Sequence, residues 1–142
     1  MTLRPGSNDD RTLLGLLLLY GTLSLVHFIH NAEFLASYPG MPATWTRAGV
    51  YGAWLVISCV GIVGWLTLRR GNRLLGLAIL ATYAVLGMDS LGHYVLAPLS
   101  AHDTWMNATI LLDVTSAALV LAEVARRFAA TLRRAPARTG PG

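Results

Sequence analysis

Residues 12–38, TLLGLLLLYGTLSLVHFIHNAEFLASY, join an apolar run to a group of polar side chains. The first 18 or so residues are almost uninterruptedly apolar, which is long enough to cross a hydrocarbon core of about 30 Å. The run then takes up His27, His30, Asn31 and Glu33 before it ends. Hydrocarbon offers ionisable groups no water, so such residues within a span are candidates for function. We therefore expect a membrane helix that carries a polar site, rather than a signal peptide.

The composition also indicates a membrane protein. Hydrophobic residues make up 54% of the 142 residues and charged residues only 13%, against about 25% charged in a soluble domain. The basic residues are eleven arginines, which stand in short clusters between and after apolar runs. That placement is typical of topology determinants and does not indicate nucleic-acid binding. Cys59 is the only cysteine, which excludes an intramolecular disulfide and a CxxC redox motif.

The hydropathy pattern predicts an all-α fold, a polytopic membrane protein with four helices in an antiparallel bundle. Turns rich in proline, glycine or arginine separate the apolar runs. The predicted spans are residues 12–36, 45–68, 74–97 and 104–124. They form one transmembrane domain, residues 12–127, between a flexible leader, residues 1–11, and a disordered basic tail, residues 128–142.

The arginines predict the orientation of the chain. In this four-span topology only Arg47 falls on the side opposite the other arginines. By the positive-inside rule both termini are cytoplasmic, and the two proline-containing turns face the periplasm or the cell exterior. The predicted location is the plasma (inner) membrane, as a multi-pass protein.

Ionisable residues gather in the outer half of the predicted bundle. His27, Asp89 and Asp113 each lie about 12–14 Å below the outer ends of their own helices, at 1.5 Å per residue. His30 and His93 lie one turn closer to the outer surface. Membrane-buried polar residues face the bundle interior, so we expect the first, third and fourth spans to bring these groups to one outer pocket.

Imidazole and carboxylate groups at these spacings favour a metal site in a helical bundle. We predict that His27, His30, Asp89 and His93 bind a transition metal ion. The sequence does not distinguish among Cu, Fe, Mn and Zn. The predicted catalytic residues are Asp113, as a ligand or general base, and Glu33, as a proton shuttle. The predicted supporting or entrance residues are Asn31, His102, Met106 and Thr109.

The function that follows is a metal-binding membrane enzyme, an oxidoreductase or a hydrolase, that acts on a lipophilic small molecule. Three alternatives stay open. The chain is a b-type haem or quinone electron-transfer subunit with His27 and His93 as axial ligands, or a small transporter or proton relay. In the third alternative it is a non-catalytic subunit of a larger membrane complex or a homo-oligomer, and its polar residues only hold helices together. The sequence leaves open whether the chain is an enzyme, and it predicts the bilayer, not nucleic acid, as its surroundings.

Overall fold

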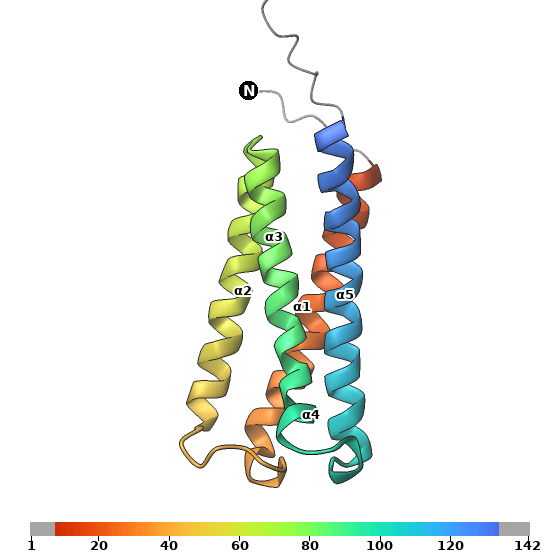
Figure 1. The fold of residues 1–142 in the computed structure, drawn as a ribbon. Coiled ribbons are helices and arrows are strands. Elements are labelled where there is room, and N and C mark those ends of the chain that lie inside the picture. The colour runs from red at the N-terminus through yellow and green to blue at the C-terminus, as the bar shows by residue number, and fades with distance from the viewer. Residues whose placement is uncertain (1–7, 134–142) are drawn as a thin grey trace, which may run out of the picture.

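The computed structural model describes residues 8–133, and all regular structure in this range is helical (Figure 1). Four segments of it are long and apolar enough to cross a membrane: Asp10–Glu33, Arg47–Arg69, Arg73–Leu96 and Thr104–Arg133. The prediction of an all-helical fold with four helical segments long and apolar enough to span a membrane is therefore confirmed for the described residues. In chain order the elements are α1 (Asn8–Glu33), η1 (Leu35–Ser37), α2 (Arg47–Arg69), α3 (Arg73–Gly87), η2 (Met88–Leu91), α4 (Gly92–Leu96), η3 (Leu99–Ala101) and α5 (Thr104–Arg133), where η denotes a short 3₁₀ helix.

The bundle has two chemically different ends (Figure 1). The start of α1, the α2–α3 turn and the end of α5 share one end, here called the terminal end. The α1–α2 and α4–α5 connections share the other, here called the distal end. At the terminal end Arg127 is only 4% exposed, and its guanidinium pairs with Glu123 at 2.7 Å and with Asp10 at 3.4 Å. The pair with Asp10 connects α5 to α1 where the predicted cytoplasmic arginines gather.

Two connections show why the helices begin and end where they do. Thr46 precedes α2 with an extended backbone, and its Oγ1 accepts a hydrogen bond from the Gly49 amide at 3.0 Å, as an N-cap residue does. Gly40 in the α1–α2 connection has a φ of 76°, a region that glycine adopts without a steric penalty. A Cβ at Gly40 would lie 2.8 Å from the carbonyl oxygen of Leu96. The connection can therefore lie directly against the end of α4.

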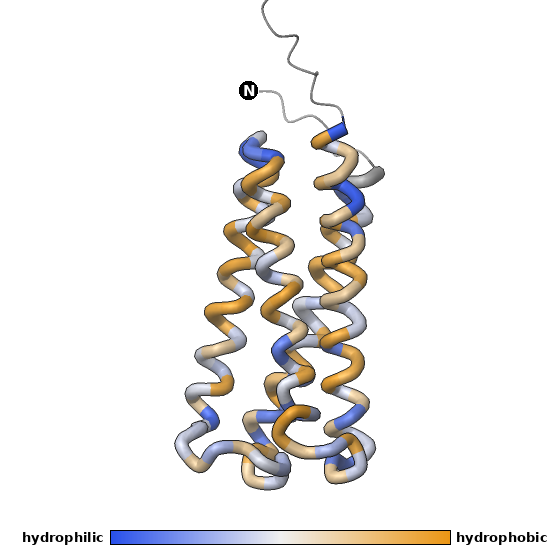
Figure 2. Tube along the Cα trace, viewed as in Figure 1, coloured by the Kyte–Doolittle hydropathy of each residue, from blue (hydrophilic) through white to orange (hydrophobic). Residues whose placement is uncertain are grey.

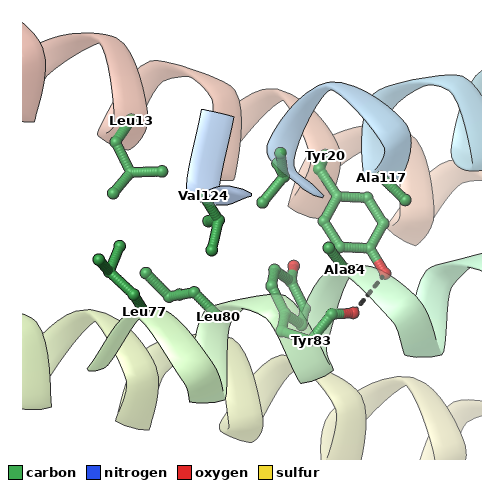
Figure 3. Packing of buried hydrophobic residues seen from close by; sticks show 9 residues of the cluster. Leu13, Tyr20, Leu77, Leu80, Tyr83, Ala84, Ala117 and Val124 are labelled. Atoms are coloured by element: carbon green, nitrogen blue, oxygen red, sulfur yellow. Dashed lines mark hydrogen bonds between the residues drawn. The ribbon is translucent and has the colours of Figure 1, made fainter. Parts of the chain in front are cut away.

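The helices pack as two pairs, α2 with α3 and α1 with α5, and α3 contacts α5 between the pairs (Figure 1). The α1–α2 interface is the least extensive of the four neighbouring interfaces. An apolar core joins α1, α3 and α5 in the middle and terminal half of the bundle (Figure 3). In it the Tyr20 hydroxyl donates to the carbonyl oxygen of Tyr83, at 3.4 Å. The core members are Leu13, Tyr20, Leu77, Leu80, Tyr83, Ala84, Ala117, Val120 and Val124.

The helices turn many large apolar side chains outward. Leu18, Val56 and Val95 are 63%, 67% and 86% exposed. Apolar residues follow the lengths of the helices, and hydrophilic residues gather toward the two ends (Figure 2). Meanwhile histidine, asparagine and aspartate side chains are buried between the helices. This distribution of exposed apolar and buried polar residues fits a bundle surrounded by lipid.

The structure corrects several predicted boundaries. The third span is not one helix, because η2 interrupts it at Met88–Leu91. The fourth helix continues to Arg133, so the first residues of the predicted disordered tail are helical. At the other end α1 begins at Asn8, within the predicted flexible leader. Predicted features of residues 1–7 and 134–142 lie outside the described residues.

Candidate functional site

Three histidine rings come together at the distal end of the bundle. The ring centroids of His27, on α1, and His93, on α4, are 5.5 Å apart. The His102 ring, from the α4–α5 connection, lies 6.2 Å from that of His93. All three side chains are buried, with exposed fractions of 2%, 7% and 5%. The first and third spans therefore do bring histidines to one place, as predicted.

Hydrogen bonds fix two of these rings. The Asn31 amide donates from Nδ2 to His93 Nε2 at 3.1 Å. In a neutral ring the proton of His93 then lies on Nδ1, which is buried and has no partner among the described residues. The Thr109 hydroxyl donates to the Met106 carbonyl, so its oxygen is free to accept from His27 Nδ1 at 3.4 Å. Asn31 and Thr109, both predicted as supporting residues, contact the histidines directly.

Tyr38 is the residue of this cluster that sequence reasoning missed. It follows η1, is 3% exposed, and its ring centroid lies 4.9 Å from that of His93. Its hydroxyl pairs with His30 Nδ1 at 2.8 Å, and burial raises the pKa of Tyr38 to about 12. A tyrosine followed directly by Pro39 and Gly40, close after two histidines, was the available signal.

A buried carboxylate lies in a separate contact of the same region. Asp113 is fully buried on α5, and the Ser90 hydroxyl donates to its Oδ2 at 2.6 Å. Its Oδ1 is buried with no partner among the described residues. Ser90 belongs to η2, so this bond connects α5 to the irregular part of the third span. Ser90 was not predicted; a small hydroxyl residue beside Asp89 was the only signal in the sequence.

The 3₁₀ segment η2 separates the faces of Asp89 and His93. A 3₁₀ helix turns about 120° per residue, whereas an α-helix turns about 100°. Over the four residues of η2 the difference amounts to about 80°. The predicted i, i+4 pairing of Asp89 with His93 on one helical face does not take account of this rotation. In the structure Ser90 and His93 are buried, whereas Asp89 is exposed.

A cavity of about 380 Å³, here called the polar cavity, adjoins the histidine cluster. It lies between α1, the α1–α2 connection, α2 and the α3–η2–α4 segment. Its size and its mostly apolar wall with a few polar groups are typical of small-molecule sites. The polar side chains in its wall are His27, Asn31, Asp89, Ser90 and His93. The apolar wall includes Phe28, Met41, Trp45, Ile57, Leu86 and Leu96.

The remaining predicted residues lie elsewhere. Glu33 accepts a hydrogen bond from the Tyr51 hydroxyl at 2.7 Å and pairs with Arg47 at 2.8 Å, on an exposed part of the α1–α2 interface. His102 donates from Nδ1 to the Pro98 carbonyl at 3.1 Å, and its Nε2 is buried without a partner among residues 8–133. Met106 packs with Tyr38 and Ile110 in a small apolar cluster of its own. None of these three side chains lines the polar cavity as the structure describes it.

The predicted metal centre has no support in the structure. Among the described residues, no group of three or more His, Cys, Asp or Glu side chains is placed to hold a metal ion. The physical reason is that the predicted ligands do not all meet at one point. The rings of His27 and His93 lie side by side, with 5.5 Å between their centroids, but His30 pairs with Tyr38 and Asp89 is exposed.

Comparison of the chain with protein-family models, with curated proteins and with solved structures found no match. The argument for function therefore rests on the site itself.

Proposed function

We propose that this protein is a multi-pass plasma-membrane protein that binds a lipophilic small molecule in the polar cavity. In this proposal both termini are cytoplasmic, and the distal end faces the periplasm or the cell exterior. The four apolar helices and the arginines of the terminal end support this topology. The polar cavity then lies in the outer half of the bilayer, where a lipophilic ligand has direct access to it.

One observation carries the proposal: two residues in the wall of the polar cavity each have a buried polar atom without a partner. These atoms are Nδ1 of His93 and Oδ1 of Asn31, as far as residues 8–133 describe. A buried polar group without a hydrogen bond costs about 1–3 kcal/mol. A ligand that satisfies both atoms recovers that cost on binding.

The two atoms define the chemistry of the ligand's headgroup. His93 Nδ1 offers a proton, so it suits a carbonyl or another acceptor oxygen. Asn31 Oδ1 accepts a proton, so it suits a hydroxyl. Quinones and their hydroquinones carry both kinds of oxygen on a flat apolar ring, and the apolar wall fits such a ring. We therefore propose this class of oxygen-bearing ring as the headgroup, with the chain acting as its binding subunit.

Tryptophan fluorescence tests the proposal, because Trp45 lines the polar cavity. A variant that keeps Trp45 and carries phenylalanine at the other three tryptophans is placed in lipid nanodiscs. It is titrated with a benzoquinone that carries a short alkyl tail, which quenches indole fluorescence on contact. We expect saturable quenching of Trp45.

Two further substitutions show whether the unpartnered atoms bind the probe. His93→Phe and Asn31→Leu remove them and should each weaken binding about 10-fold, which corresponds to about 1.4 kcal/mol. Val26→Phe is the control, since Val26 is on α1, is 47% exposed and does not line the cavity. Circular dichroism checks that each variant folds. Quenching that does not saturate, or equal affinity in all three variants, would overturn the proposal.

A further inference from the structure

A second cavity of about 380 Å³, here called the apolar groove, lies between α1 and α2 on the terminal-end side of the polar cavity. Tyr83 of α3 also lines it, and its ring would lie 2.9 Å from a Cβ added at Gly61. The groove exists because glycine and other small side chains leave the least extensive helix interface partly unfilled. Its wall is mostly apolar, and its polar members are Thr22, Ser58, Tyr83 and the two tryptophans Trp54 and Trp65.

The groove and the polar cavity are lined by the same face of α1. Leu14, Leu18, Gly21 and Leu25 line the groove, and Phe28 lines the polar cavity. These five residues follow each other at intervals of four, three, four and three, which keeps them on one face of a helix. On α2 the walls also adjoin, because Trp54 and Ser58 belong to the groove and Ile57 to the polar cavity. The two hollows therefore follow one another along the α1–α2 interface.

We propose that the apolar groove holds the hydrocarbon tail of the ligand whose headgroup occupies the polar cavity. The ligand is then a single-tailed amphiphile, with its oxygen-bearing ring near His93 and Asn31 and its tail running along α1 toward the terminal end. This inference rests on the proposed function and adds the tail to it. From Leu25 to Leu14 the groove covers 11 residues of helix, or about 16 Å, so a tail of about that length would fill it.

The dimensions of the groove favour a chain over a helix as its occupant. One turn of an α-helix is about 10 Å wide and 5.4 Å high, about 400 Å³, which would already fill the whole groove. A hydrocarbon chain is far narrower and can follow a groove of this length. The groove also adjoins a cavity that offers polar partners for a head at one end only. A single tail attached to one head matches that asymmetry.

Trp54 lies where the head and the tail would join. Its Nε1 is buried without a partner among the described residues, and its ring lines the groove. Trp54 and His27 each lie about 10 Å from the distal ends of their helices, at 1.5 Å per residue. The indole therefore offers a third donor at the level of the headgroup. An oxygen of the ligand head would satisfy it.

The tryptophans allow a test that separates the head from the tail. Trp45 reports on the polar cavity, Trp65 on the groove, and Trp105, 72% exposed and in neither wall, on the surrounding lipid. Three variants each keep one of these tryptophans, and a fourth keeps Trp45 together with Trp54 to measure how far the loss of the Trp54 indole changes the affinity. Each is titrated in nanodiscs with two benzoquinones, one with a short alkyl tail and one with a long tail that carries bromine near its end. We expect the short probe to quench Trp45 only, and the long probe to quench Trp45 and Trp65 over the same concentration range.

A groove-filling substitution provides the second arm. Ser58→Phe places a ring in the groove, while Val56→Phe, on the 67% exposed face of the same helix, is its matched control. Ser58→Phe should leave the affinity of the short probe within about twofold and weaken the long probe about 10-fold or more. Val56→Phe should change neither. If both variants bind the long probe with equal affinity, the proposal that the groove holds the tail is wrong.

The outcomes separate the two proposals. If both probes quench Trp45 saturably and neither quenches Trp65, the groove does not hold the tail. The headgroup site in the polar cavity is then unaffected. No saturable Trp45 quenching by either probe refutes the headgroup site, and with it this inference. Trp65 quenching that excess unlabelled long-tailed quinone does not displace identifies bulk lipid in the groove. If Trp65 becomes less accessible to the brominated probe as the number of protein chains per nanodisc rises, a second copy of the chain occupies the groove. Each of the last two results also shows that the groove does not hold the tail.

Discussion

Replacing Gly87 by alanine should destabilise the bundle, because this position has no room for a Cβ. Gly87 is buried at the end of α3, where it faces Tyr20 of α1 and Ala117 of α5. An added Cβ would overlap the Tyr20 hydroxyl, and would lie 2.6 Å from Tyr20 Cζ and 2.9 Å from the Cβ of Ala117. Ordinary contacts of this kind are 3.4–4 Å, so α1 or α5 must move.

The expected loss can be worked out from two opposing effects. Overpacking of a well-packed interior costs about 1–3 kcal/mol. Alanine is a better helix former than glycine by up to about 1 kcal/mol, which offsets part of that cost. We expect a net loss of about 1–2 kcal/mol, a five- to thirtyfold fall in the folding equilibrium constant. Since η2 begins at the next residue, the shift should also weaken binding of the short-tailed quinone in the polar cavity.

Equilibrium unfolding in mixed micelles, followed by tryptophan fluorescence and circular dichroism, measures the change. Gly15→Ala is the control, because a Cβ there meets nothing within 4 Å among the described residues. It should leave stability unchanged or raise it slightly. Adding Tyr20→Phe to Gly87→Ala removes the overlapping hydroxyl and should restore part of the loss. If Gly87→Ala and Gly15→Ala have the same stability, the tight α1–α3–α5 contact is not as described.

Three further predictions follow from the site. Ser90→Ala removes the bond to Asp113 and should cost about 1–3 kcal/mol in the same unfolding assay, whereas exposed Asp89→Ala should cost little; equal losses would argue against the described orientation of η2. Burial raises the pKa of Tyr38 to about 12 against about 10 in the unfolded chain, so its contribution to stability is full below pH 10 and is lost as pH rises through 12. The stability of the wild type should therefore fall by up to about 3 kcal/mol more than that of Tyr38→Phe between pH 10 and pH 12, and parallel curves would contradict this. Treatment with a strong chelator should change neither the fold nor quinone binding, and a loss of either on chelation, restored by one added metal, would revive the metal site.

Much of the candidate site was predictable, and the errors have one physical origin. His27, His93 and Asn31 were chosen because polar groups inside an apolar span must face the protein, and the structure places them together. Asp89 was paired with His93 by assuming i, i+4 spacing on a regular α-helix, but η2 interrupts that helix, and Asp89 is exposed while Ser90 is buried. Glu33 was assigned to the site because of its position in the sequence, but Arg47 and Tyr51 hold it at the exposed surface. These choices depend on contacts between helices, which a single sequence does not reveal.

The amino-acid sequence alone determined that this protein is all-helical, with four segments long and apolar enough to cross a membrane, and which end of the bundle carries most arginines. Those properties depend on the length and hydrophobicity of local segments, and each segment contributes almost independently of the others. Only the tertiary structure decided which polar atoms are left without partners, where Tyr38 packs, and that a polar cavity and an apolar groove adjoin along α1. The cause is that the 3₁₀ segment η2 and a few glycines at the helix interfaces alter which surfaces meet. Such effects depend on several helices at once.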